Sequence, residues 1–321
     1  MASSPPAVSA SPGRVDLTRP GGPRSTGEAV IRGLLFVAAA VSVVTTVLIV
    51  FSLITETVKF FGDVGLSKFL FGTKWTPQLA GEQQSFGILP LLVGTLYLTG
   101  IGLLVAVPLG LLSAIYLAEY APPRIRKIVK PVLEVLAGVP TIVFGFFALT
   151  FVTPELLQGV LGLQTEQFNQ LAAGLIVGVL VLPTVASVAE DAMSAVPGSL
   201  REGAFGLGAN KMKVALRVVF PAALSGIVAA LVLGASRAIG ETLVILLAGG
   251  SGQLLPEIVT DARDSGGSMA AFIASTATGD APTGSIEYET IFAVGFFLFL
   301  FTLVLNLISI RLVNRFRQVY E

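Results

Sequence analysis

Six apolar runs, each about 20 residues or longer, constrain the fold of this chain more than any other feature. A helix of that length crosses a hydrocarbon core of about 30 Å and satisfies its backbone hydrogen bonds internally. The runs cover residues 33–54, 87–117, 131–151, 171–189, 218–248 and 291–310. The sequence therefore predicts an all-α, polytopic membrane protein with six transmembrane helices.

The composition agrees with this fold class and excludes several kinds of chemistry. Hydrophobic residues make up 54% of the chain and charged residues only 12%, whereas soluble domains carry about 25% charged residues. The absence of Cys and His excludes disulfides, thiolate and imidazole metal sites, and catalysis by either side chain. We expect no metal, no catalytic residue and, at a formal net charge of zero, no nucleic-acid partner; the expected surroundings are membrane lipid.

The distribution of Lys and Arg predicts the orientation. Fifteen of the twenty basic residues fall on one side of the predicted spans and four on the other, with Arg237 inside a span. Cytoplasmic segments carry the excess of Lys and Arg, so both termini are predicted to be cytoplasmic in a plasma (inner) membrane. Residues 1–28, rich in Pro, Ser and Gly, are predicted to be a disordered tail, and residues 29–321 one transmembrane domain. Residues 55–86 and 249–289 are predicted to be external loops, with the single Trp, Trp75, near the membrane interface.

Two charged residues, Arg237 and Glu241, interrupt the fifth run. Residues four apart share one face of a helix, and a charge near the bilayer centre costs at least about 2.5 kcal/mol. One interpretation is a structural ion pair between helices. The other is a cationic station for an anion, with Glu241 holding the guanidinium, because the planar fork of Arg binds oxyanions through two hydrogen bonds.

The segment 197–217 between the fourth and fifth runs has the pattern of a helix and not only of a solvated loop. Ser199 and Glu202 have the spacing of a capping box, and Gly206 or Gly208 can end the helix. Asn210 can begin a second helix that leads into the fifth run.

Breaks are expected inside the runs. Pro140, followed by Thr141, and Pro183 lie within the third and fourth runs, where they bend the helix or line a path with broken helix. Gly174 and Gly178 form a GxxxG pattern, which is typical of close helix packing.

These segments carry a family resemblance. One pattern resembles the permease signature of ABC importers. It consists of Glu202-Gly203-Ala204, three further residues, Gly208, nine further residues, Val218, one residue and Phe220-Pro221. Residues 137–145 and 236–242 are similar to segments of the phosphate-specific permeases of the PstC type. The resemblance implies a type I ABC importer permease fold, with a cytoplasmic coupling helix that contacts an ATPase through Ser199, Glu202, Gly203, Ala204 and Gly208.

The resemblance also implies a function and its partners. It implies a permease subunit of an ATP-driven inorganic phosphate importer that forms the translocation path with a second homologous permease, with Arg237 and Glu241 in that path. An ATPase homodimer binds the cytoplasmic loops and holds ATP and Mg, and an extracytoplasmic phosphate-binding protein delivers the ligand. This subunit needs no cofactor and lacks the P-loop order, so it is not expected to hydrolyse ATP.

Three alternatives stay open: the sister permease of the PstA type, an ABC permease for another oxyanion, and a stand-alone ion-coupled carrier or channel. Under the main hypothesis, closure of the ATPase pushes the helix at 200–208. That helix is expected to be continuous through 211–221 with the fifth span, so the push would tilt Arg237 and Glu241.

Overall fold

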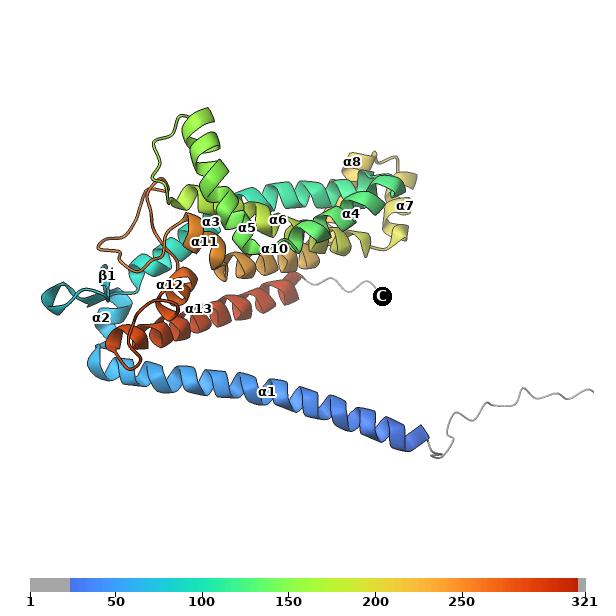
Figure 1. Ribbon diagram of the computed structural model, residues 1–321. Helices are drawn as coiled ribbons and strands as arrows, with labels where there is room; N and C mark the ends of the chain where they lie inside the picture. Colours follow the sequence, from blue (N-terminus) through green and yellow to red (C-terminus); the bar gives the residue numbers. More distant parts are fainter. Residues whose placement is uncertain (1–23, 317–321) are drawn as a thin grey trace, which may run out of the picture. The chain divides into compact units, whose positions relative to one another are not determined.

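The computed structural model describes residues 24–316, and the chain divides into two units, residues 1–52 and 53–321. The described part of the first unit belongs to helix α1 (Arg24–Asp63), which passes into the second unit at Leu53 (Figure 1). The predicted tail lies outside the described residues up to residue 23, and residues 24–28 are helical. The first apolar run is thus the middle of a longer helix.

Most of the predicted spans are helices of sufficient length. α3 (Leu89–Ile115), α6 (Gln170–Ser194) and α13 (Ile286–Phe316) cover the second, fourth and sixth runs. Within residues 24–316, five helices are long and apolar enough to cross a membrane, or six when one bent pair counts as a single span. The prediction of an all-α membrane protein is confirmed.

The third run is not one helix. α4 (Pro123–Ala137) ends before Pro140, and α5 (Thr141–Phe147) begins after it and continues as a π-helix (Ala148–Val160). Proline disfavours the helical conformation of the residue before it. The prediction of one helix over 131–151 is therefore wrong. The helix in this part of the chain that is long and apolar enough to cross a membrane is Thr141–Val160.

The fifth run is broken twice. α8 (Lys211–Val214), a π-helix (Ala215–Val219) and α9 (Phe220–Ala222) precede α10 (Leu224–Ile239), and the axis bends by 73° between α9 and α10. A second break separates α10 from α11 (Leu243–Ala248). The prediction of one continuous helix over 218–248 is wrong.

The segments predicted as external loops carry structure. Residues 64–86 contain α2 (Leu66–Phe71), a 3-10 turn (Gly81–Gln83) and an antiparallel pair, β1 (Trp75–Thr76) with β2 (Ser85–Phe86). Residues 249–289 contain α12 (Met269–Ala277). Trp75 is fully buried, with its ring edge-on to Phe272 at a centroid distance of 4.9 Å, because these two segments pack on each other.

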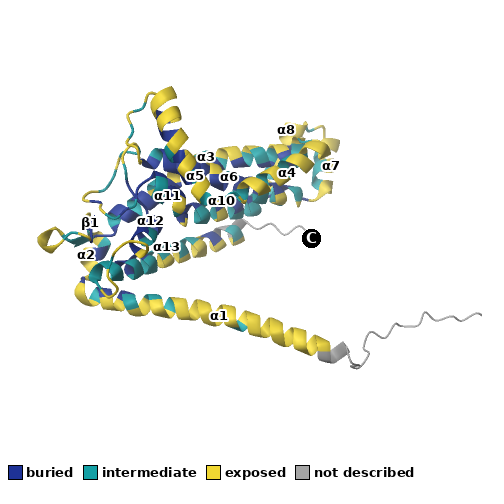
Figure 2. Cartoon of the chain, in the orientation of Figure 1, coloured by how far each residue is buried: buried dark blue, intermediate teal, exposed yellow. Residues whose placement is uncertain are grey.

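The centre of the second unit is the contact between α3 and α6, and buried residues concentrate there (Figure 2). A Cβ atom added at Gly174 would lie 2.7 Å from Ile101, and one at Gly178 would lie 2.8 Å from the Gly102 carbonyl oxygen. The GxxxG pattern therefore marks a close approach of two helices. α7 and α8 lie at one end of this unit, and β1, α2 and α12 lie at the other (Figure 1).

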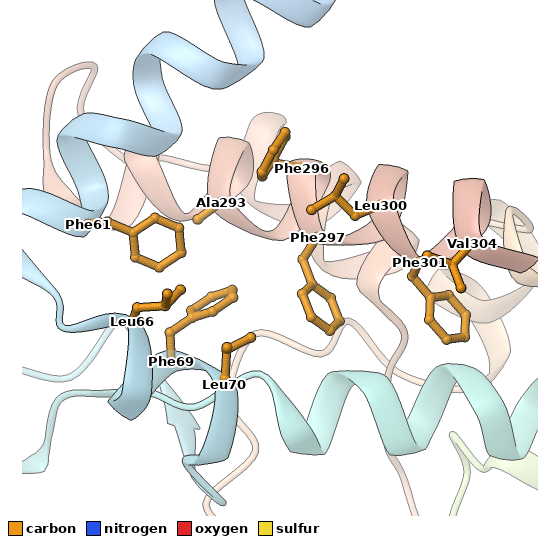
Figure 3. A pocket seen from close by; sticks show the side chains of 10 residues that line it. All are labelled: Phe61, Leu66, Phe69, Leu70, Ala293, Phe296, Phe297, Leu300, Phe301 and Val304. Atoms are coloured by element: carbon orange, nitrogen blue, oxygen red, sulfur yellow. The ribbon is translucent and has the colours of Figure 1, made fainter.

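An apolar pocket of about 370 Å³ lies between α2 and α13 (Figure 3). Five of its ten lining side chains are phenylalanines, and none is polar. It is lined by Phe61, Leu66, Phe69, Leu70, Ala293, Phe296, Phe297, Leu300, Phe301 and Val304. Its walls suit apolar chains and offer no polar group to an anion.

Candidate functional site

Arg237 lies in the last turn of α10 and reaches two neighbouring helices. Its Nη1 donates to Thr184 Oγ1 of α6 at 3.0 Å, and its Nη2 lies 3.4 Å from the carbonyl oxygen of Ala137, the last residue of α4. The guanidinium thus stands where α10, α6 and the end of α4 meet.

Glu241 does not pair with Arg237, which corrects the expectation of one shared helix face. α10 ends at Ile239, so Glu241 lies in the break before α11. Its side chain is buried, with the residue 8% exposed, and its Oε1 accepts from the Val244 amide at 3.4 Å. The carboxylate therefore accepts a hydrogen bond from the first turn of α11, where a negative charge is favoured.

This geometry leaves a half-buried cation without a counter-ion. No Asp or Glu side chain within residues 24–316 forms an ion pair with Arg237. Its two hydrogen bonds go to neutral oxygens and leave its charge uncompensated. A guanidinium in such surroundings attracts an oxyanion more strongly than one in water.

The predicted kink residues lie around Arg237. Pro140 directly precedes α5 and Thr141 is the first residue of that helix, so both follow the break that frees the Ala137 carbonyl. Pro183 lies inside α6, which stays helical through it, and is followed by Thr184. The break at Pro140 and the helix at Pro183 thus bring a carbonyl and a hydroxyl to one cation.

The coupling segment folds as a helix, but without the predicted capping box. α7 (Gly198–Gly206) begins after Pro197, which is the N-cap residue. Ser199 is therefore already inside the helix and makes no cap with Glu202. Pro197 has an extended ψ of 136°, so the helix starts two residues earlier than the pattern predicted.

The other boundaries agree with the sequence. Gly208 has a φ of +79°, a conformation that side chains rarely adopt, and lies in the turn that ends α7. Asn210 caps α8 by accepting from the Lys213 amide at 2.9 Å. Ser199, Glu202 and Gly203 are exposed and Ala204 is half-buried. The residues predicted to contact an ATPase therefore lie on an accessible surface, together with Leu207, which is 91% exposed.

Sequence reasoning missed the residue that holds α7 in place, Arg201. Its Nε donates to Glu119 Oε1 at 3.0 Å, its Nη1 to the Val196 carbonyl at 2.6 Å and its Nη2 to the Met193 carbonyl at 2.7 Å. The cation therefore satisfies carbonyls at the C-terminal end of α6, where positive charge is favoured. The only signal in the sequence was its place beside Glu202.

A second missed group surrounds Glu190 of α6, which is 1% exposed. Its carboxylate pairs with Arg126 and, at 2.9 Å, with Lys130, both on α4. Ser194 donates to the same carboxylate at 2.9 Å. The hydrogen bond from Lys130 to Asp191, and to a lesser degree the one to Glu190, raises the pKa of the Lys130 ammonium. This basic residue therefore holds α4 against α6, in addition to contributing to the charge bias that predicts the orientation.

Comparisons with known proteins identify the family. Residues 106–318 match the model described as "Binding-protein-dependent transport system inner membrane component". A probable ABC transporter permease protein, YqgH, of Bacillus subtilis is 33% identical, over 88% of this chain and 91% of that one. The phosphate transport system permease protein PstC of Haemophilus influenzae is 29% identical, over 82% and 84%.

The fold agrees with the family match. A chain in the crystal structure of a bacterial ABC transporter involved in the import of the acidic polysaccharide alginate matches at 18% identity and a TM-score of 0.61, covering 92% of this chain and 100% of that one. The chain therefore has the type I ABC importer permease fold and belongs to the binding-protein-dependent transport system inner membrane component family.

Proposed function

We propose that the chain is the PstC-type permease subunit of an ATP-driven importer of inorganic phosphate. The observation that carries the proposal is Arg237, a half-buried guanidinium inside the broken fifth span with no carboxylate partner in the described chain. Inorganic phosphate is a small oxyanion that its planar fork can bind. The Haemophilus influenzae relative, named as a phosphate transport permease, favours this anion over others.

Glu241 balances the charge of the path in this proposal. Its carboxylate faces the Val244 amide and not Arg237, so the guanidinium stays available to the anion. A weak site is expected, because an ion bound too tightly would not leave. Pro140, Thr141 and Pro183 place the broken backbone and Thr184 beside the cation.

The proposed complex contains three kinds of partner. A second homologous permease completes the path, an ATPase homodimer docks on the exposed side of α7, and an extracytoplasmic phosphate-binding protein delivers the ion. Ser199, Glu202, Gly203, Ala204 and Gly208 form or shape the docking surface in this proposal. ATP and Mg belong to the ATPase and this subunit needs no cofactor of its own; α7 and both termini lie on the cytoplasmic side.

Uptake of labelled phosphate by the complex reconstituted in vesicles, measured against ATP hydrolysis, tests the proposal. Arg237→Gln should abolish uptake while the complex still assembles, because the substitution removes the cation and keeps a hydrogen-bonding side chain. Arg124→Gln is the matched control, since Arg124 is exposed on α4 and forms no ion pair in the described chain. Full uptake by the Arg237→Gln variant would contradict the assignment.

The same assay separates the alternatives. Inhibition by sulfate or molybdate stronger than by unlabelled phosphate would indicate a permease for another oxyanion. Uptake that persists without the ATPase would indicate a stand-alone carrier or channel. Co-purification with a partner of the PstC type instead of the PstA type would identify this chain as the sister permease.

A further inference from the structure

We infer that Arg201 is a positioning residue that transmits movement of α7 to Arg237 through α6 and α4, and not through α8, α9 and α10. The inference rests on the proposed function in one respect: it takes α7 as the element on which the ATPase acts. It departs from the direct route that the sequence predicts.

Arg201 fixes α7 to two other elements at once. All three guanidinium nitrogens donate. One donates to Glu119, in the π-helix (Tyr116–Tyr120) that follows α3, and two donate to the carbonyls of Met193, in the last turn of α6, and Val196, just after it. The Arg201 side chain is 21% exposed and that of Glu119 6%. A planar fork with three short, largely water-excluded bonds resists both sliding and rotation, so α7 cannot shift without moving α6.

α6 leads from this contact to Arg237. Thr184, which accepts from Arg237, precedes Met193 by nine residues on the same helix, about 14 Å along its axis. No Gly or Pro lies between these two residues. This half of α6 is therefore a stiff connection between the coupling helix and the cation.

α4 runs between the same two places. Arg126 and Lys130 tie it to Glu190 of α6 near the α7 end. Its last residue, Ala137, presents its carbonyl oxygen to Arg237. Two helices joined at one end by a buried carboxylate thus both reach the same guanidinium, and their joint displacement would change its two oxygen contacts.

The direct route along the chain is interrupted. The backbone turns at Gly208 between α7 and α8, and the axis bends by 73° between α9 and α10. A break of this kind absorbs a push as a change in angle. The contacts of Arg201 and Glu190 bypass both interruptions.

A single cysteine tests this route, because the natural chain has none. Val139→Cys places a thiol in the break between Ala137 and Pro140. Val139 is not one of the residues that hydrogen-bond to Arg237. The probe is the rate of maleimide labelling of this thiol in the complex with its ATPase subunits, with and without ATP and orthovanadate. We expect nucleotide to change the rate severalfold in the Val139→Cys chain and in its Arg124→Gln control.

Arg201→Gln should remove most of that nucleotide response while the ATPase subunits stay bound and still hydrolyse ATP. Glu119→Gln is isosteric and removes the negative charge that faces the Arg201 guanidinium, although the amide oxygen still accepts a hydrogen bond, so it should weaken the response. It decides the question if the Arg201→Gln complex does not assemble. If the Arg201→Gln complex assembles and its nucleotide response is unchanged, the inference is overturned. If that complex does not assemble, an unchanged response in the Glu119→Gln complex overturns it.

The labelling needs no transported ion, so the two proposals fail separately. A complex that takes up no phosphate but loses its nucleotide response with Arg201→Gln would keep this route and reject the phosphate assignment. A complex that takes up phosphate but keeps its nucleotide response with Arg201→Gln would support the phosphate assignment and reject this route.

Discussion

Thr184 Oγ1 accepts a hydrogen bond of 3.0 Å from Arg237 Nη1, which joins the middle of α6 to the end of α10. The bond orients the guanidinium without neutralising it, since a hydroxyl carries no charge. Pro183 directly precedes Thr184 within a helix that stays intact. The charged residue of the fifth run therefore depends on a neutral residue of the fourth for its orientation.

Thr184→Val should reduce phosphate uptake by about tenfold at low phosphate. The substitution preserves the shape of the side chain and removes the acceptor of a charged hydrogen bond, which contributes about 1.5 kcal/mol, or roughly tenfold in an equilibrium. Initial rates in reconstituted vesicles measure the effect. Thr184→Ser keeps the hydroxyl and should retain most of the uptake; an equally poor Ser variant would argue for a packing role instead.

Glu190→Gln should lower the free energy of unfolding by about 1–3 kcal/mol, because it removes a buried acceptor of charged hydrogen bonds. The loss is not larger because its partners Arg126 and Lys130 keep some access to water, with side chains 38% and 31% exposed. Asp191→Asn is the control: Asp191 is 61% exposed, and exposed pairs contribute about 1 kcal/mol or less. Thermal unfolding in detergent compares the two, and equal shifts would count against a special role of burial.

Lys130 should make part of this stability dependent on pH. Its pKa is raised in the folded protein above the ordinary 10.5 by Asp191 and Glu190. A raised pKa means that the contribution is fully present below 10.5 and is lost as pH rises through the folded value. The difference in thermal stability between the native chain and Lys130→Met should therefore be constant from neutral pH to about 10 and shrink above it. A difference that grows with alkaline pH would have the wrong sign.

The sequence predicts the number and placement of most spans because length and apolar content determine which segments can cross a bilayer. It does not predict which proline breaks a helix. Pro140 follows Gly138 and Val139, and the helix ends there; Pro183 follows an apolar stretch packed on α3, and α6 continues through it. Tertiary packing, which a single run does not show, decides between the two outcomes.

The spacing of Arg237 and Glu241 shows the same limit. Four residues predict a shared face only when the helix continues, and α10 ends at Ile239. The sequence identifies Arg237 as a charge within the fifth run, but the acceptors of its hydrogen bonds, Thr184 and Ala137, lie 53 and 100 residues away. The contacts of Arg201 were hidden for a similar reason, because two of its three acceptors are backbone carbonyls.

Trp75 should report on the packing of the second unit. It is the single Trp of the chain, fully buried against Phe69 and Phe272. Intrinsic emission should therefore be blue-shifted, resist quenching by aqueous acrylamide and move to longer wavelength on unfolding. Efficient quenching in the folded protein would instead place the ring at the interface, as the sequence alone predicts.

Gly178→Ala should destabilise the contact between α3 and α6 by about 1–3 kcal/mol, the usual cost of overpacking a core. The new Cβ would lie 2.7 Å from Val105 Cβ and 2.8 Å from the backbone oxygen of Gly102, and backbone cannot rotate away. Gly100→Ala, on α3, is the matched control, since a Cβ there meets nothing within 4 Å. Alanine is favoured over glycine inside a helix by up to about 1 kcal/mol, so the control should be neutral or slightly stabilising. Thermal unfolding of both variants in detergent measures the contrast, and a Gly178→Ala protein as stable as Gly100→Ala would show that the two helices can separate without loss.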